Sequence, residues 1–121
     1  MIHEEICTYE VCKLAKEKGF DVPTFGYYRI DTEDWYRTDV YDDWNDSTIR
    51  YSAPTQSLLQ RWLREEKGIH IIIDGGFQWG LEDLQRHFTG RDIQVGIGAF
   101  GLFDTYEEAL DDALLYALQN V

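Results

Sequence analysis

The sequence has few basic residues and no long apolar run, and each shortage excludes a class of protein. It contains 11 Lys and Arg against 23 Asp and Glu, a net charge of −12. We therefore expect no direct nucleic-acid binding and no anionic-membrane binding, because both depend on basic residues. No apolar run approaches the roughly 18 to 20 residues of a membrane span, and MIHEEICTYE lacks the basic start of a signal peptide. We expect a soluble protein of the cytoplasm.

Cysteine and histidine are also scarce. Cys7 and Cys12 lack the C-x-x-C spacing of zinc and redox sites, and around a helix they lie too far apart to bridge easily. We expect two reduced, small side chains. His3, His70 and His87 show no metal-ligand spacing. These residue types therefore predict no metal site.

No catalytic or cofactor motif has the context it needs. Residues 96–101, GIGAFG, match G-x-G-x-x-G, but the next predicted helix begins too late and no further strand follows. Glu82 and Asp83 are neighbours on a predicted strand, so they point to opposite sides and cannot share a substrate. No serine or cysteine has a recognisable nucleophile setting. We expect no enzyme and no cofactor.

What the chain does have is enough apolar sequence for one core. At 121 residues, with 44% hydrophobic and 15% aromatic residues, it is predicted to form a single domain, 1–121. Apolar residues at helical spacing predict three helices, and runs rich in β-branched and aromatic residues predict the strands. The predicted helices lie within 8–18, 51–68 and 104–121, and the predicted strands within 24–31, 35–41, 69–74, 77–85 and 93–103.

This order, α-β-β-α-β-β-β-α, predicts an α+β two-layer sandwich with the helices on one face of a mainly antiparallel sheet. Residues 14–20, LAKEKGF, resemble residues 63–69, LREEKGI. The similarity fits either an αββ repeat or the ordinary Lys-Gly stop of a helix. Asp74, Gly75 and Gly76 predict a hairpin turn. For residues 81–88 a strand and a helix both stay open.

The densest chemistry lies in DTEDWYRTDVYDDWND, residues 31–46, which has seven carboxylates, one arginine and four aromatic rings. Strict alternation turns Tyr36, Thr38 and Val40 toward the covered side of the sheet, and Trp35, Arg37, Asp39 and Tyr41 toward solvent. Trp44 is expected to be exposed in the loop. Tryptophan and tyrosine are favoured anchors of protein interfaces. The partner-binding hypothesis names Trp35, Tyr41, Trp44, Asp39, Asp42 and Asp43.

The same stretch allows two other interpretations. DWNDS, residues 43–47, begins like a calcium loop but lacks the glycine and glutamate that an EF-hand requires. A weaker cation site of Asp42, Asp43, Asn45 and Asp46 stays open. Carboxylates spaced along a strand could also imitate phosphates and occupy a basic groove, although the acids here have mixed parity.

Residues 52–58, SAPTQSL, open the second predicted helix and suggest a further hypothesis. Ser52 and Thr55 could cap the helix, or they could hold a small nucleotide-like anion there with Arg50 and Arg61. A structural alternative is that the basic face of this helix meets the acidic hairpin within the chain or across a homodimer.

The block SAPTQSLLQRWLREEKGIHI, with the terminal TYEEALDDALLYAL, resembles a family of small acidic proteins of gut Bacteroides and their phages. The resemblance covers most of the chain and implies the element order and a phage or mobile-element origin. It implies no activity and transfers no catalytic residue. The leading hypothesis is therefore a small binding protein that engages a host protein or itself, with the anion, nucleic-acid-mimic and homo-oligomer interpretations as alternatives.

Overall fold

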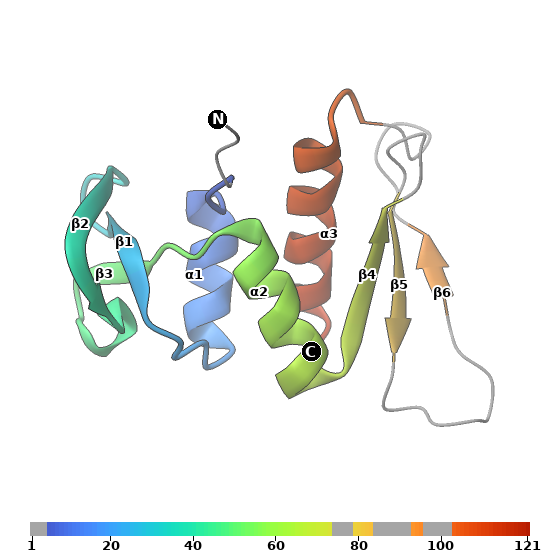
Figure 1. Cartoon of the computed structure of the whole chain (residues 1–121), viewed down its shortest axis with the longest axis horizontal. Helices are drawn as coiled ribbons and strands as arrows, with labels where there is room; N and C mark the ends of the chain where they lie inside the picture. The colour runs from blue at the N-terminus through green and yellow to red at the C-terminus, as the bar shows by residue number, and fades with distance from the viewer. Residues whose placement is uncertain (1–4, 74–78, 84–92, 96–102) are drawn as a thin grey trace. The chain divides into compact units, whose positions relative to one another are not determined.

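The computed structural model describes residues 5–73, 79–83, 93–95 and 103–121 (Figure 1). The chain divides into two compact units, Met1–Ser57 and Leu58–Val121, each of which is described by itself. The α+β class, the antiparallel pairing and the element order are confirmed. The described strands form two three-stranded sheets rather than one, and a short strand, β3, is added after the hairpin. The division into a single domain stays a prediction.

The first unit contains one helix and one sheet. Helix α1 (Tyr9–Glu17) is followed by β1 (Thr24–Arg29), β2 (Trp35–Asp42) and β3 (Arg50–Ser52), which pair antiparallel in the order β2-β1-β3. Thr8 is the N-cap residue of α1. The predicted stop is also present, because Gly19 has a φ of +92°, which an L side chain rarely adopts.

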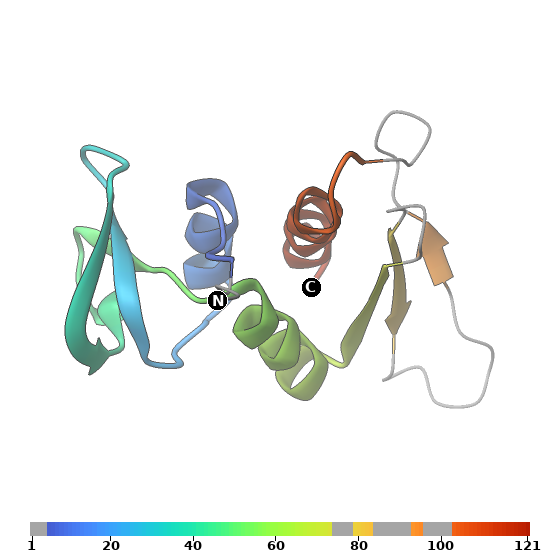
Figure 2. The same cartoon turned by 45° about the horizontal axis from the view of Figure 1, so that its top comes forward.

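Helix α1 covers one face of this sheet, as both views show (Figures 1 and 2). The Tyr9 ring packs on Tyr28 and Tyr51, with centroids 5.8 and 5.5 Å apart. The Lys16 ammonium donates to the carbonyl oxygens of Ser47 and Arg50, at 2.6 and 3.2 Å. Val11, Cys12 and Ala15 are buried, and both cysteines are free thiols, as expected.

The second unit has a regular sheet under a long helix. Strands β4 (Ile69–Ile73), β5 (Trp79–Asp83) and β6 (Ile93–Val95) pair antiparallel in that order. Helix α3 (Tyr106–Gln119) lies along β4 and β5 and begins at Thr105, whose hydroxyl accepts from the Glu108 amide (Figure 1). Its buried stripe repeats at helical spacing: Ala109, Leu110, Ala113, Leu114, Ala117 and Leu118.

Trp79 completes this core. It is buried, its ring packs on Tyr116 with centroids 5.1 Å apart, and its Nε1 donates to Asp112 Oδ2 at 2.7 Å. Ile71 and Leu81 are buried on the same sheet, while Ile72 is exposed, as its alternation predicts.

The second predicted helix is shorter than expected. Helix α2 (Gln56–Trp62) continues into a π-helical turn, η2 (Leu63–Lys67), which ends at Gly68 with a φ of +68°. Leu59, Trp62 and Leu63 are buried, as the sequence indicates. Residues 79–83 form a strand, whereas 84–88, the predicted turn at Asp74 and the GIGAFG motif lie outside the described residues. Within the described chain no helix has the length and apolar character to cross a bilayer.

Candidate protein-binding face

The hairpin of β1 and β2 contains a large bulge that alternation along β2 does not reveal. Gly26 pairs with Arg37 and Thr24 pairs with Asp42. Between these pairs β1 has one residue, Phe25, and β2 has four, Thr38–Tyr41, which is three more. The Thr38 hydroxyl lies within the bulge, where it accepts from Val40 N at 3.1 Å and has two acceptors for its one proton, Val40 O at 2.8 Å and Phe25 O at 3.2 Å.

The bulge reverses the side of the sheet on which the β2 side chains that follow it lie. An odd number of extra residues switches the side on which later side chains lie. Tyr36 and Tyr41 therefore share one face, although the sequence analysis put them on opposite faces. The prediction that Tyr36 and Val40 turn toward a covered side is wrong, because they are 39% and 57% exposed.

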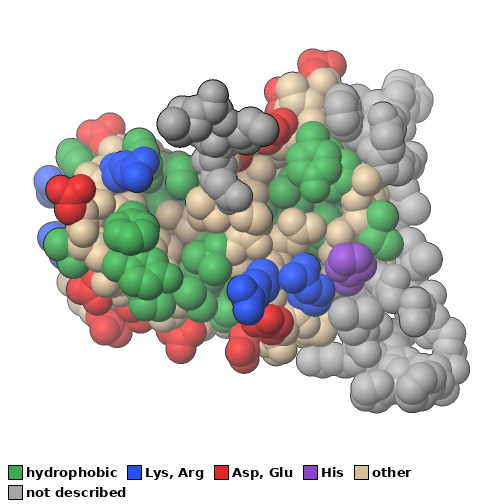
Figure 3. All heavy atoms as spheres, in the orientation of Figure 1, with side chains coloured by type: hydrophobic (Ala, Val, Ile, Leu, Met, Phe, Trp, Pro, Cys, Tyr) green, Lys and Arg blue, Asp and Glu red, His purple; other side chains and the backbone are tan. Residues whose placement is uncertain are grey.

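The face away from α1 is lined with aromatic rings. Tyr27 stacks on Tyr36 at 5.6 Å and contacts the Trp44 ring at 5.0 Å. Phe25, two residues before Tyr27 and so on the same face, packs on Tyr41 at 4.7 Å. We call these five residues, Phe25, Tyr27, Tyr36, Tyr41 and Trp44, the outward aromatic face. Figure 3 shows hydrophobic side chains over the first unit with basic and acidic ones beside them.

One arginine lies on part of this face. The Arg50 guanidinium is 4.9 Å from the centre of the Tyr27 ring and 5.6 Å from that of Trp44. The Phe25 and Tyr41 side chains are 52% and 55% exposed. The outward aromatic face therefore has an inner half, covered by the chain's own arginine, and an outer half, the Phe25–Tyr41 pair, that is exposed to solvent.

Trp35, a predicted anchor, lies on the opposite face from Tyr41. It pairs with Tyr28, whose hydroxyl donates to Cys7 O at 2.8 Å on the α1 side. A Cβ placed on Gly26 would lie 2.8 Å from Trp35 Nε1. Trp35 is 43% exposed, as expected, but it lies over Gly26 and outside the outward aromatic face.

Trp44 is half-buried, so its predicted exposure is wrong. It opens a short 3₁₀ turn, η1 (Trp44–Asp46), and its Nε1 donates to Thr24 O at 3.0 Å. Asn45 ties the turn to the unit, because its side chain donates to Phe20 O and accepts from Ser52 N, both at 2.8 Å. A buried tryptophan N–H needs such a partner, which fixes the ring. Trp44 is a structural part of the face.

These contacts also bear on the cation hypothesis for residues 42–46. The Asn45 carbonyl accepts from Ser52 N, and Asp43 Oδ1 accepts from Asn45 N at 3.0 Å. Asp42 Oδ1 accepts from Asp43 N at 2.8 Å. Three of the proposed oxygen ligands thus already accept backbone N–H groups. In the described part of the chain no group of three His, Cys, Asp or Glu has a metal-binding arrangement.

The acids of this region still lie close enough to affect one another. Desolvation raises the pKa of the Asp43 carboxyl, and the charges of Asp46, Asp21 and Asp42 raise it further. The hydrogen bond from Asn45 N acts in the opposite direction. Asp39 lies exposed in the bulge, and Asp42 is exposed opposite Thr24. The bulge interrupts the regular strand spacing, so the geometry gives no support to phosphate imitation.

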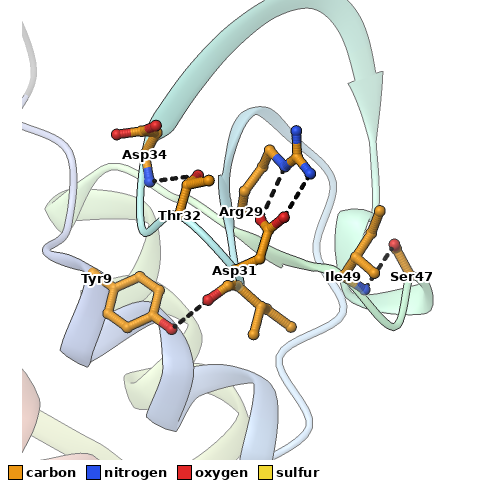
Figure 4. Close-up of polar contacts among 8 residues, drawn as sticks. Tyr9, Arg29, Asp31, Thr32, Asp34, Ser47 and Ile49 are labelled. Atoms are coloured by element: carbon orange, nitrogen blue, oxygen red, sulfur yellow. Dashed lines mark hydrogen bonds and ion pairs between the residues drawn. The ribbon is translucent and has the colours of Figure 1, made fainter.

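The tip of the hairpin shows how this unit pairs one of its arginines (Figure 4). Arg29 donates from Nε and Nη2 to the two carboxylate oxygens of Asp31, at 3.1 and 2.7 Å. The Tyr9 hydroxyl lies 3.5 Å from Ile30 O, where it donates to the same turn. Residues 30–34 connect β1 to β2, and Glu33 has a φ of +60°.

The anion hypothesis stays a prediction, although its residues take part in other contacts. Ser52 is fully buried in β3, and Thr55 forms a bridge with Ile6. The first amide of α2, that of Gln56, donates to Glu5 O at 2.8 Å. Arg50 lies on the outward aromatic face, and Arg61 pairs with Glu65 at 3.0 Å. The homodimer hypothesis stays a prediction for the basic residues Arg61, Arg64 and Lys67.

Sequence reasoning missed three members of the outward aromatic face, Phe25, Tyr27 and Tyr36. The signal was present, since Phe25 and Tyr27 alternate along β1 and so share a face.

Comparison with protein-family models, with curated proteins and with solved structures gave no match. The geometry of this face therefore supports the functional argument by itself.

Proposed function

We propose that the protein is a non-enzymatic binding module that holds a basic surface of a partner protein on its outward aromatic face. The observation that carries the proposal is the solvent exposure of Phe25, Tyr36 and Tyr41 on a face that α1 does not cover. Contiguous exposed aromatic side chains are typical of interaction sites.

The charge around this face supports a basic partner. Residues 31–46 hold seven carboxylates and one arginine, and Asp31 pairs with Arg29. A second copy of the chain would bring two such acidic segments together, and nucleic acid would be repelled. By the resemblance to Bacteroides and phage proteins, the partner is a host protein of the cytoplasm, and this chain is an accessory protein of a phage or mobile element.

Capture from a lysate of the native host tests the proposal. The immobilised protein is compared with the double variant Phe25→Ala/Tyr41→Ala, and recovered proteins are quantified by mass spectrometry. The expected result is one enriched protein with a basic surface, which binds saturably when purified and is lost with the double variant. Interface anchors typically cost about 2 kcal/mol or more on truncation, roughly a thirtyfold loss of affinity.

Tyr106→Ala is the matched control, because Tyr106 is 44% exposed at the start of α3 in the other unit. It should leave capture unchanged. Equal capture by the double variant, or a complex made only of copies of this chain, would contradict the proposal.

A further inference from the structure

The Phe25–Tyr41 pair is the part of the outward aromatic face with the most open ring surface. The two rings lie 4.7 Å apart and tilted by 35°, and both side chains are more than half exposed. The described cation–π contacts of the first unit involve Tyr27, Trp44 and Tyr51 and leave this pair uncovered.

The inner half of the same face shows what chemistry such rings accept. Arg50 lies over Tyr27 and Trp44 at 4.9 and 5.6 Å, within the range of a cation–π contact. Arg50 comes from the short strand β3 (Arg50–Ser52). The aromatic surface that binds Arg50 continues, through the Tyr27–Tyr36 stack and the alternation of β1, to Phe25 and Tyr41.

A second arginine of the unit, Arg29, shows how the edge of a guanidinium pairs with a carboxylate. Arg29 binds Asp31 through two parallel hydrogen bonds, at 3.1 and 2.7 Å (Figure 4). A planar guanidinium can stack on a ring with its flat side and pair with a carboxylate at its edge, whereas a lysine ammonium is a compact point charge. Exposed Asp39, two residues before Tyr41 in the bulge, is the carboxylate that we assign to this role.

From these contacts we propose that the outer half of the outward aromatic face binds an arginine side chain of the partner, with the guanidinium lying on the Phe25–Tyr41 pair. The inference rests on the proposed function and deepens it. The binding module then selects arginine over lysine, since cation–π stacking of a ring and the forked hydrogen bond to Asp39 act on the same group. The partner segment presents arginine in an exposed, basic stretch.

Three glycine-spaced peptides that carry arginine, lysine or citrulline test this selectivity. Binding of each to the full chain is followed by NMR, from the shifts of the tyrosine and phenylalanine ring signals. The arginine peptide should bind about 2- to 5-fold more tightly than the lysine peptide, because the second hydrogen bond of the guanidinium fork, which an ammonium cannot make in the same geometry, is worth about 0.5 to 1 kcal/mol. Citrulline has a similar planar group without the charge, and its peptide should not bind measurably.

Two variants separate the ring surface from simple hydrophobic area. Phe25→Leu/Tyr41→Leu keeps an apolar surface and removes the π faces, so the affinity for the arginine peptide and its preference over the lysine peptide should both fall. Asp39→Asn should weaken the arginine peptide and leave ring shifts of the inner half unchanged. Tyr106→Ala should bind all three peptides like the wild type. A melting curve of each variant confirms that it is folded.

Equal binding of the arginine and lysine peptides, or an arginine preference that is undiminished in the leucine double variant, would overturn the inference. Its failure differs from a failure of the proposed function. If a host protein is captured through Phe25 and Tyr41 while the arginine peptide neither binds nor competes, only the arginine inference is wrong. If the alanine double variant captures the host protein as the wild type does, the proposed function itself is wrong.

Discussion

In the first unit Phe25, Tyr36 and Tyr41 lie exposed on the sheet β2-β1-β3, whereas in the second unit Trp79 is buried on the sheet β4-β5-β6 beneath α3. Both units place a helix before three antiparallel strands, and both of those helices end near a glycine with positive φ. The first sheet is covered by α1 on one face, and its other face displays rings. On similar three-stranded sheets, an aromatic side chain is therefore part of the core in the second unit, whereas aromatic side chains face solvent in the first.

The hairpins differ in regularity as well. Strands β4 and β5 pair over five successive residues without interruption, while β1 and β2 contain the bulge at Thr38–Tyr41. A bulge and a row of charges on an edge strand are also ordinary protection against aggregation. In this unit the bulge has a second consequence, because it places Tyr41 on the same face as Tyr36.

Removing core volume from the second unit should have the largest effect on stability. Leu114 is fully buried in α3, so Leu114→Ala should lower the free energy of unfolding by about 2 to 5 kcal/mol. Denaturant titration followed by circular dichroism measures it. Tyr41→Ala in the exposed face should change the same quantity by less than about 0.5 kcal/mol. If the two variants lost comparable free energy of unfolding, the exposed face would contribute to stability as much as the core, and the two units would not differ in this respect.

A methyl group at Gly26 should have an intermediate effect. Its Cβ would lie 2.8 Å from Trp35 Nε1 and 3.2 Å from Tyr36 O, so the indole must move. We expect Gly26→Ala to cost about 1 to 3 kcal/mol and to shift the indole N–H signal of Trp35 in an NMR spectrum. The double variant Gly26→Ala/Trp35→Ala should recover part of the loss; no recovery would mean that the Tyr36 backbone, not the indole, is the obstacle.

The smallest effect should come from the acids around the 3₁₀ turn. Because the pKa of Asp43 is raised in the folded protein, folding favours its protonated form, and stability is lost as pH rises through the folded pKa. Asp43→Asn keeps an oxygen to accept from Asn45 N and removes this loss. Relative to the wild type, the variant should gain stability between about pH 3 and pH 7. An unchanged stability difference across this range would mean that the folded protein does not raise the pKa of Asp43.

Much of the fold followed from local pattern. The stripe of α3, its Thr105 cap and the glycines at 19 and 68 depend on interactions within a few residues, and the sequence displays these directly. The alternation of β4 also held, because its pairing with β5 is regular. These elements could be predicted because no distant contact overrides them.

The candidate site could be predicted only in part. The sequence predicted aromatic anchors near residues 35–44, and two of the residues it named, Tyr41 and Trp44, belong to the outward aromatic face. The bulge brings the Thr38 hydroxyl within 3.2 Å of Phe25 O, 13 residues away along the chain, and the position of Trp44 depends on its bond to Thr24 O. Arg50 reaches the face only because β3 pairs with β1. Each of these is a long-range contact that alternation alone does not encode.

The most direct test of the account compares the two units within one complex. Hydroxyl-radical footprinting of the chain, free and bound to its captured host protein, reports which aromatic side chains lose solvent access. We predict strong protection of Phe25, Tyr36 and Tyr41 and unchanged labelling of Tyr106. Protection of Tyr106 with unchanged labelling of Phe25, Tyr36 and Tyr41 would contradict the assignment of binding to the outward aromatic face.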